Sequence, residues 1–147
     1  MSTRSAIARQ NPDGSVDVIY CHWDGYLTGV GLELVGHYST KVKLDRLIEL
    51  GNISTLEDTL EATKEQCGGS YFPAEHYDSL EELQESLIDS MIEYLYVGTP
   101  STCQADVWLP DIEWHAYHRY TDFTKAVFLP NPYILYTKLE DLITKEV

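Results

Sequence analysis

A turn signal near the start of the chain constrains the fold more than any other feature. Residues 11–15 read Asn-Pro-Asp-Gly-Ser. The proline presets the backbone of the first turn position, and Gly14 can take a positive φ. Segments with strand character flank this turn, at residues 5–10 and 16–20. The pattern predicts a β-hairpin at the N-terminal end of the chain.

Helix signals dominate the part of the chain that follows the hairpin. Apolar residues at four-residue spacing predict helices over residues 29–38 and 41–50. Capping boxes that begin at Ser54, Ser79 and Thr137 predict three more helices. The first of these three should end near Gln66 and the last at Val147. In the helix after Ser79, the apolar stripe predicted to face the core comprises Leu80, Leu83, Leu87, Ile88 and Met91.

Strand-like runs return after this helix. We expect strands over residues 92–97, 105–109 and 112–120, with shorter apolar runs at 125–129 and 133–136. In the first of them, Tyr94 and Tyr96 should face away from Leu95 and Val97. The succession predicts one α+β domain, residues 1–147, whose antiparallel sheet starts with the hairpin and packs with about four to five helices.

The charge of the chain is strongly negative and unevenly distributed. The formal net charge is -14 in 147 residues, yet no Lys or Arg lies between Lys64 and Arg119. Such a surface attracts basic partners, and it disfavours nucleic-acid binding because that binding relies on neutralising phosphates. The simpler alternative is a solvated face that keeps the protein soluble. The acidic surface that we predict comprises Asp78, Glu81, Glu82, Glu85, Asp89 and Glu93.

Other sequence features bear on where the protein acts. No run of about 18 apolar residues predicts a membrane-spanning helix. The N-terminal residues show no secretion signal. The three cysteines are odd in number and far apart, which is no disulfide framework. These features predict a cytoplasmic protein with no membrane partner.

The window from Tyr20 to Tyr26 holds the densest set of reactive side chains in the chain. It reads Tyr-Cys-His-Trp-Asp-Gly-Tyr. Recognition of a ligand or partner is the function that we assign to it, and the residues concerned are His22, Trp23, Asp24 and Tyr26. The alternative is a packed structural loop, in which Asp24 accepts hydrogen bonds from amides at a helix start. In that case Trp23 and Tyr26 pack the hairpin against the first helix.

Catalytic and metal sites have weaker support. Cys21 could be a nucleophile with His22 or His37 as its base, but nothing nearby favours a thiolate. Zinc ligands usually come as spaced pairs, and adjacent strand residues point to opposite faces, so we predict no metal. His115 and His118 also fall on opposite faces of a strand. We expect no catalytic residues, and because no phosphate-binding motif is complete, we expect no cofactor.

The first third of the chain resembles a family of small uncharacterised proteins found mostly in bacteriophages and mobile elements. The resemblance rests on the Tyr-Cys-His-Trp-Asp-Gly-Tyr string, the Asn-Pro-Asp-Gly-Ser turn and the sequence from Leu47 to Leu56. Leu27 follows the string where members of the family often have proline. The resemblance implies a phage context, in which the protein would act in the host cytoplasm, and brings no reaction with it.

Two hypotheses follow for the function. The first is an acidic, non-enzymatic protein that binds a host protein with a basic surface. Such a protein could inhibit a host defence or nucleic-acid enzyme, and nucleic-acid mimicry is one way in which it could do so. The second is a small enzyme or ligand-binding protein, in which His22, Trp23, Asp24 and Tyr26 converge on a concave site. Self-association of the chain stays open under both.

Overall fold

The N-terminal hairpin forms as the turn signal indicates. The computed structural model describes residues 3–66, 72–100 and 112–128. In it, β1 (Ser5–Gln10) pairs antiparallel with β2 (Val16–Cys21). The Asp13 carboxylate closes the turn, accepting hydrogen bonds from the Ser15 N–H at 3.0 Å and the Ser15 hydroxyl at 2.6 Å. Gly14 has a φ of 91°, which other residues rarely adopt. The predicted hairpin is confirmed.

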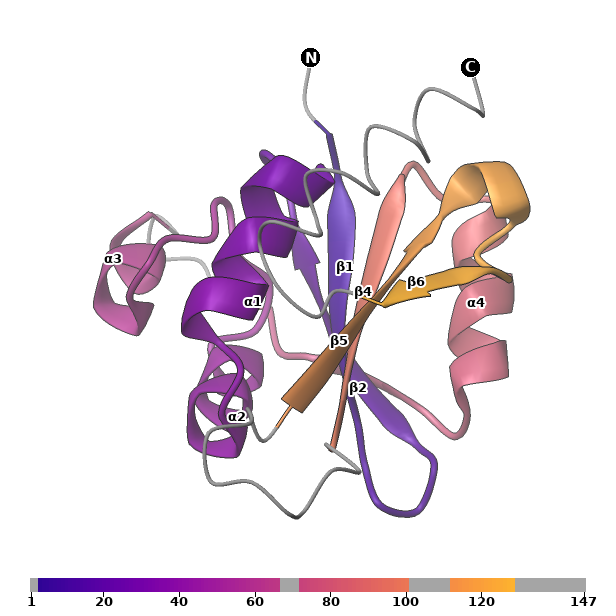
Figure 1. Cartoon of the computed structure of the whole chain (residues 1–147), viewed down its shortest axis with the longest axis horizontal. Coiled ribbons are helices and arrows are strands. Elements are labelled where there is room, and N and C mark those ends of the chain that lie inside the picture. The colour runs from indigo at the N-terminus through magenta and orange to yellow at the C-terminus, as the bar shows by residue number, and fades with distance from the viewer. Residues whose placement is uncertain (1–2, 67–71, 101–111, 129–147) are drawn as a thin grey trace.

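A mixed sheet forms the centre of the molecule (Figure 1). Its six strands in the described residues run in the order β3-β2-β1-β4-β5-β6. The remaining strands are β3 (Glu75–Tyr77), β4 (Tyr94–Pro100), β5 (Ile112–His118) and β6 (Ala126–Phe128). The α+β class is confirmed, but the sheet is not purely antiparallel, because β1 and β4 pair in parallel. The hairpin partner already occupies one side of β1, and the long helical connection returns the chain along the other.

One face of the sheet is covered by the helices of the first half of the chain (Figure 1). They are the π-helical turn η1 (Leu27–Gly31), α1 (Leu32–His37), α2 (Lys41–Glu49) and α3 (Leu60–Glu65). Strand side chains such as Ile7, Tyr96 and Trp114 meet helical leucines here and form the larger core. The predicted helices at 29–38 and 41–50 are confirmed, apart from the π-helical first turn.

The opposite face is covered by α4 (Leu80–Ile88), which packs Leu83 and Leu87 against small sheet residues such as Ala6 and Ala8. The Ser79 side chain caps this helix by accepting from the Glu82 amide, as the capping box predicts. Leu95 and Val97 face α4, whereas Tyr94 and Tyr96 face the larger core, which confirms the predicted alternation in β4.

The sequence reading of the apolar stripe on α4 is wrong at its end. Ile88 is 45% exposed and Met91 68% exposed. The helix stops at Ile88, and Met91 lies beyond it, so neither side chain continues the buried row of Leu83 and Leu87. The end of the predicted stripe is therefore two exposed apolar side chains, one at the last turn of α4 and one just past it.

The third helix begins five residues later than its supposed capping box indicates. Residues 54–57 are not helical; α3 starts at Leu60, and Thr59 caps it by accepting from the Ala62 amide. A parallel bridge between Cys21 and Ile53 holds the segment before it in extended form. The Ser54 carbonyl then bonds to the Trp23 amide, at 2.9 Å, instead of opening a helix. The elements predicted at 105–109, 133–136 and 137–147 lie outside the described residues.

A charged network links the hairpin to α2 and to edge strand β3. The Arg9 guanidinium donates to Asp17 at 2.7 Å and to Asp45 at 2.9 Å. Asp17 also shares a 2.8 Å hydrogen bond with His76, its cross-strand neighbour on β3. Partial burial disfavours ionisation, but hydrogen bonds from Asn11, His76 and Arg9 outweigh it and lower the pKa of Asp17 to about 2.

The low pKa of Asp17 predicts an acid-sensitive contribution to stability. Because the folded pKa lies below the ordinary value of 3.8, the contribution is full above about pH 5 and disappears as the pH falls towards 2. We expect Asp17→Asn to lower the free energy of unfolding by about 1–2 kcal/mol at pH 7 and by much less at pH 2.

Urea melts at several pH values measure this difference. Asp89→Asn is the control, because Asp89 is exposed and has no ion pair with any described residue. A destabilisation by Asp17→Asn that is the same at both pH values would contradict the assignment.

In the part of the chain that the structure describes, no helix is long and apolar enough to cross a membrane.

Candidate functional site

The loop from His22 to Tyr26 is fixed to the fold through its backbone. The Trp23 amide donates to the Ser54 carbonyl at 2.9 Å, and the Gly25 amide donates to the Thr3 carbonyl at 2.8 Å. The Tyr96 hydroxyl, buried in the larger core, donates to the Gly25 carbonyl at 2.7 Å. A Cβ atom on Gly25 would lie 2.7 Å from the Thr3 carbonyl oxygen, so only glycine fits at this approach.

Asp24 turns the chain from the strand into η1, but its carboxylate is no helix cap. Its φ is 55°, in the left-handed region that Asp tolerates better than most residues. The backbone carbonyl of Asp24 accepts from the Val30 amide at 2.9 Å. The carboxylate accepts instead from the Tyr26 hydroxyl, at 3.2 Å. The prediction that this side chain caps the helix start is therefore wrong, since η1 has no side-chain cap.

The four predicted recognition residues form two pairs. His22 and Trp23 meet edge to face with ring centroids 4.6 Å apart, and the Tyr20 hydroxyl shares a 2.8 Å hydrogen bond with His22 Nδ1. Asp24 and Tyr26 form the second pair. Trp23 is 47% exposed and Tyr26 40% exposed, so neither is the buried packing residue that the structural alternative requires, although the Tyr26 ring lies close to Gly29 of η1. Both aromatic side chains of the loop are partly exposed.

The loop does not line any of three hollows that the described residues form. Their volumes are about 550, 370 and 270 Å³. None of them is lined by His22, Trp23, Asp24 or Tyr26. None of these three hollows is therefore the convergent pocket that the enzyme hypothesis expects.

Cys21 cannot act as the nucleophile of this loop at neutral pH. Its side chain is fully buried, and its thiol donates to the Trp23 carbonyl at 3.4 Å. Burial raises the pKa of the Cys21 thiol to about 12. His37, the more distant candidate base, lies at the end of α1, where its Nε2 is 3.8 Å from a Glu33 carboxylate oxygen. Cys21 is a core residue.

Among the described residues, no group of three or more His, Cys, Asp and Glu side chains could hold a metal ion. His115 and His118 lie on β5, so they project to opposite faces of the sheet, and His118 lies between the rings of Tyr94 and Tyr120.

The predicted acidic surface lies mainly on the outer side of α4. Glu81, Glu82, Glu85 and Asp89 are exposed and form no ion pair with any described residue. The other two predicted members differ. Asp78 lies 3.9 Å from His76, and Glu93 is partly buried. Exposed Ile88 follows Glu81 and Glu85 at helical spacing, so apolar and acidic side chains share this side of α4.

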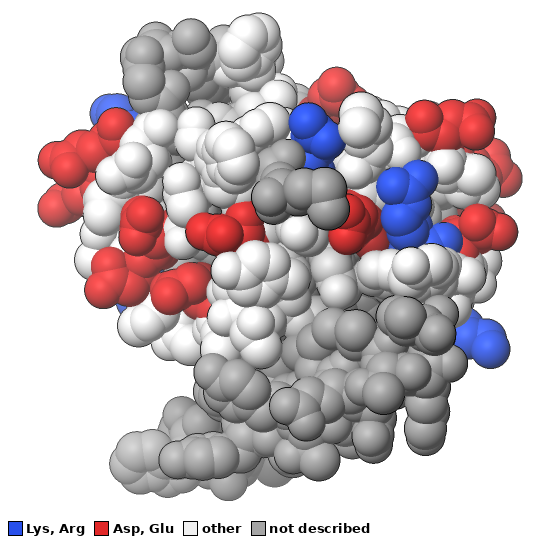
Figure 2. Space-filling model, turned by 90° about the horizontal axis from the view of Figure 1, so that it is seen from above, with Lys and Arg blue, Asp and Glu red and all other residues white. Residues whose placement is uncertain are grey.

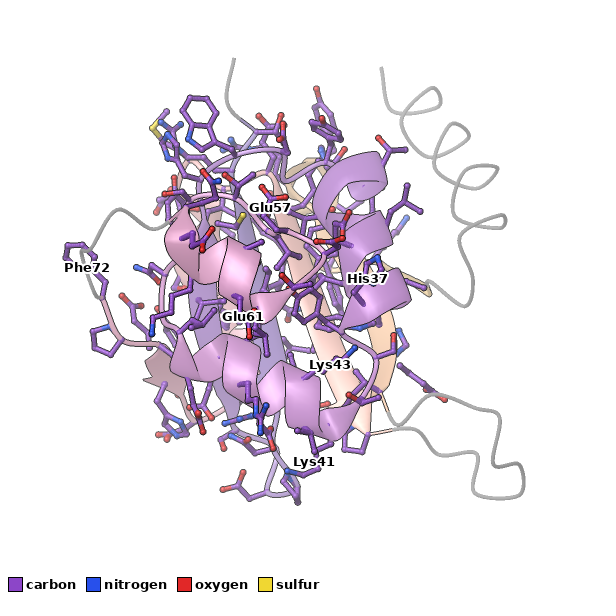
Figure 3. The ribbon with its side chains drawn as sticks, turned by 90° about the vertical axis from the view of Figure 1, so that its left-hand side faces the viewer. His37, Lys41, Lys43, Glu57, Glu61 and Phe72 are labelled. Atoms are coloured by element: carbon purple, nitrogen blue, oxygen red, sulfur yellow. The ribbon has the colours of Figure 1, made fainter. Side chains whose placement is uncertain are left out.

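A second acidic group lies on the opposite face of the sheet, where Glu33 of α1 meets the segment before and within α3. Burial first, and then the charges of Asp58 and Glu57, raise the pKa of Glu33. Figure 3 shows Glu57 and Glu61 with His37 and Lys43 around the same side of the helices. Sequence spacing carries no signal for this group, because Glu33 and Asp58 come together only where α1 lies near the segment before α3.

Acidic side chains are not confined to one side of the molecule. Figure 2, seen from above, shows them towards the left and the right margins and also between the two. The second group also borders the hollow of about 270 Å³, which Lys43 and His37 line together with Asp58 and Glu61. Its charge is thus partly balanced, whereas no cation is paired with the four exposed acids of α4 in the described segments.

Comparison with known proteins gives no relatives: no family model, no curated protein and no solved structure matches this chain.

The exposure of Trp23 predicts a small effect of its removal on stability. We expect Trp23→Ala to lower the free energy of unfolding by about 1–2 kcal/mol, because about half of the indole is already in water. Trp114 is 1% exposed in the core, so Trp114→Ala should cost about 3–5 kcal/mol. Urea denaturation followed by circular dichroism measures both. Equal losses in the two variants would show that the loop is part of the core.

Proposed function

We propose that the protein is not an enzyme and acts by binding a partner protein with a basic surface through the outer side of α4. One observation carries the proposal: Glu81, Glu82, Glu85 and Asp89 are exposed on one helix, with no ion pair to a described residue. Unpaired carboxylates on a regular element produce a negative field that speeds the association of a basic partner.

The apolar side chains beside these acids supply a second kind of contact. Ile88 is exposed at helical spacing from Glu81 and Glu85. Met91, just past the end of α4, is exposed with its sulfur 3.8 Å from Arg4 Nη1. Methionine adapts to irregular partner surfaces, and burial of apolar area adds affinity that salt does not screen. Electrostatic attraction would bring the partner to α4, and Ile88 and Met91 would then be buried against it.

The phage context narrows the partner class within this proposal. The resemblance of the first third to small bacteriophage proteins makes a bacterial host protein the expected partner. A host defence or nucleic-acid enzyme has the basic surface that the proposal requires, since such a surface binds phosphates. An acidic protein that occupies this surface inhibits the enzyme by competing with its nucleic acid.

Affinity capture tests the proposal with two variants of matched charge. The α4 variant carries Glu81→Gln, Glu85→Gln and Asp89→Asn. The control carries Glu57→Gln, Asp58→Asn and Glu61→Gln, so each removes two glutamates and one aspartate. Bait protein is immobilised, bacterial lysate is applied at about 50 mM and about 500 mM salt, and captured proteins are identified by mass spectrometry.

We expect the wild type and the control to capture the same basic protein at low salt, and the α4 variant to lose it. Capture should weaken as salt rises, because screening acts on the charged contacts. No partner at low salt, or equal capture by the α4 variant, would contradict the proposal.

A further inference from the structure

The loop at the end of β2 is built as a rigid support for exposed side chains. Four chain segments hold its backbone: Thr3 before β1, residue Ser54, strand β4 through Tyr96, and η1 through Val30. The Gly25 carbonyl is buried and satisfied. Because the loop backbone is already fixed, little main-chain conformational entropy is lost when a partner binds the side chains of Trp23, Asp24 and Tyr26.

The composition of this exposed surface favours one kind of ligand group. Aromatic side chains on a preorganised backbone are typical of the residues that dominate protein interfaces. Here they flank a carboxylate in the sequence, and the Tyr26 hydroxyl lies 3.2 Å from Asp24 Oδ1. No Lys, Arg or His in the described residues pairs with that carboxylate. A cation bound to Asp24 would therefore lie beside the Tyr26 ring.

Arginine fits this arrangement better than lysine. Its planar guanidinium pairs with a carboxylate through two parallel hydrogen bonds and also stacks on an aromatic face. Cation–π contact adds to the charge attraction at a partly exposed site. The net charge of -14 favours the approach of any basic segment, so selectivity for arginine over lysine is the property that the loop itself must supply.

We infer that Asp24 and Tyr26, with the exposed Trp23 next to Asp24 in the sequence, form a docking surface for an arginine side chain of a basic protein segment. The inference rests on the proposed function, since it names the residue type by which the basic partner is held. It adds a second contact surface, on the loop from His22 to Tyr26, which is separate from the surface on α4.

Titration with short peptides tests the inference without a known partner. The probes are hexa-arginine and hexalysine, added to the full-length protein in about 150 mM NaCl. The dissociation constants are measured by isothermal titration calorimetry for the wild type, Asp24→Asn, Tyr26→Ala and Trp23→Ala. The α4 variant defined above is the control for general electrostatic attraction. Thermal melts confirm that each variant is folded.

We expect hexa-arginine to bind the wild type about fivefold more tightly than hexalysine. Each loop variant should remove this preference, and the α4 variant should weaken both peptides alike while keeping it. Equal affinity of the two peptides for the wild type, or a preference that survives the three loop substitutions, would overturn the inference. The lysate capture fails or succeeds independently of this result, because it depends on α4.

Discussion

The hydrogen bond from the Tyr96 hydroxyl to the Gly25 carbonyl joins the centre of the sheet to the loop that carries the exposed aromatic residues. Tyr96 lies on β4, the strand that pairs in parallel with β1. Burial raises the pKa of its hydroxyl well above the ordinary value, so it remains a donor at any physiological pH. A buried carbonyl without a partner is costly. The loop therefore has one favourable position, and the direction of its side chains follows from the core.

Local sequence signals predicted the elements whose formation depends on local chemistry. The turn at Asp13 and Gly14, the cap at Ser79 and the alternation of Tyr94 and Tyr96 each rest on residues close in sequence. These features are correct in the structure. The hairpin alone fixes the register of β1 and β2, since the turn decides which residues face each other.

Features that depend on contacts between distant segments could not be predicted. The sequence Ser54-Thr55-Leu56-Glu57 has the form of a capping box, yet these residues are not helical, and Ile53 just before them bridges to Cys21. Trp23 is of a residue type that often packs in protein cores, but its side chain is 47% exposed. Glu33 and Asp58 come together only when α1 packs on the segment before α3. In each case, tertiary packing overrides a local preference.

For the acidic surface, too, the sequence predicted what depends on neighbouring residues and missed what depends on the folded structure. The sequence identified the acids of α4, because they occupy one helix with no basic residue nearby. It did not show that apolar Ile88 and Met91 would be exposed beside them, which depends on where α4 ends. The two surfaces that support a binding function, the outer side of α4 and the loop after β2, thus differ in how they arise. The residues of the first surface are close in sequence, on or next to one helix. The second surface depends on hydrogen bonds from four segments of the chain.

Native-state hydrogen exchange at the loop amides tests this account most directly. If the loop is a fixed support, the Trp23, Gly25 and Val30 amides are protected by their bonds to Ser54, Thr3 and Asp24. Their exchange in the wild type should then be at least about 100-fold slower than in an unstructured peptide. Tyr96→Phe, which leaves the Gly25 carbonyl unpaired, should accelerate exchange at Gly25 and its neighbours. Exchange at the unprotected rate in the wild type would show that the loop is mobile and would contradict the account.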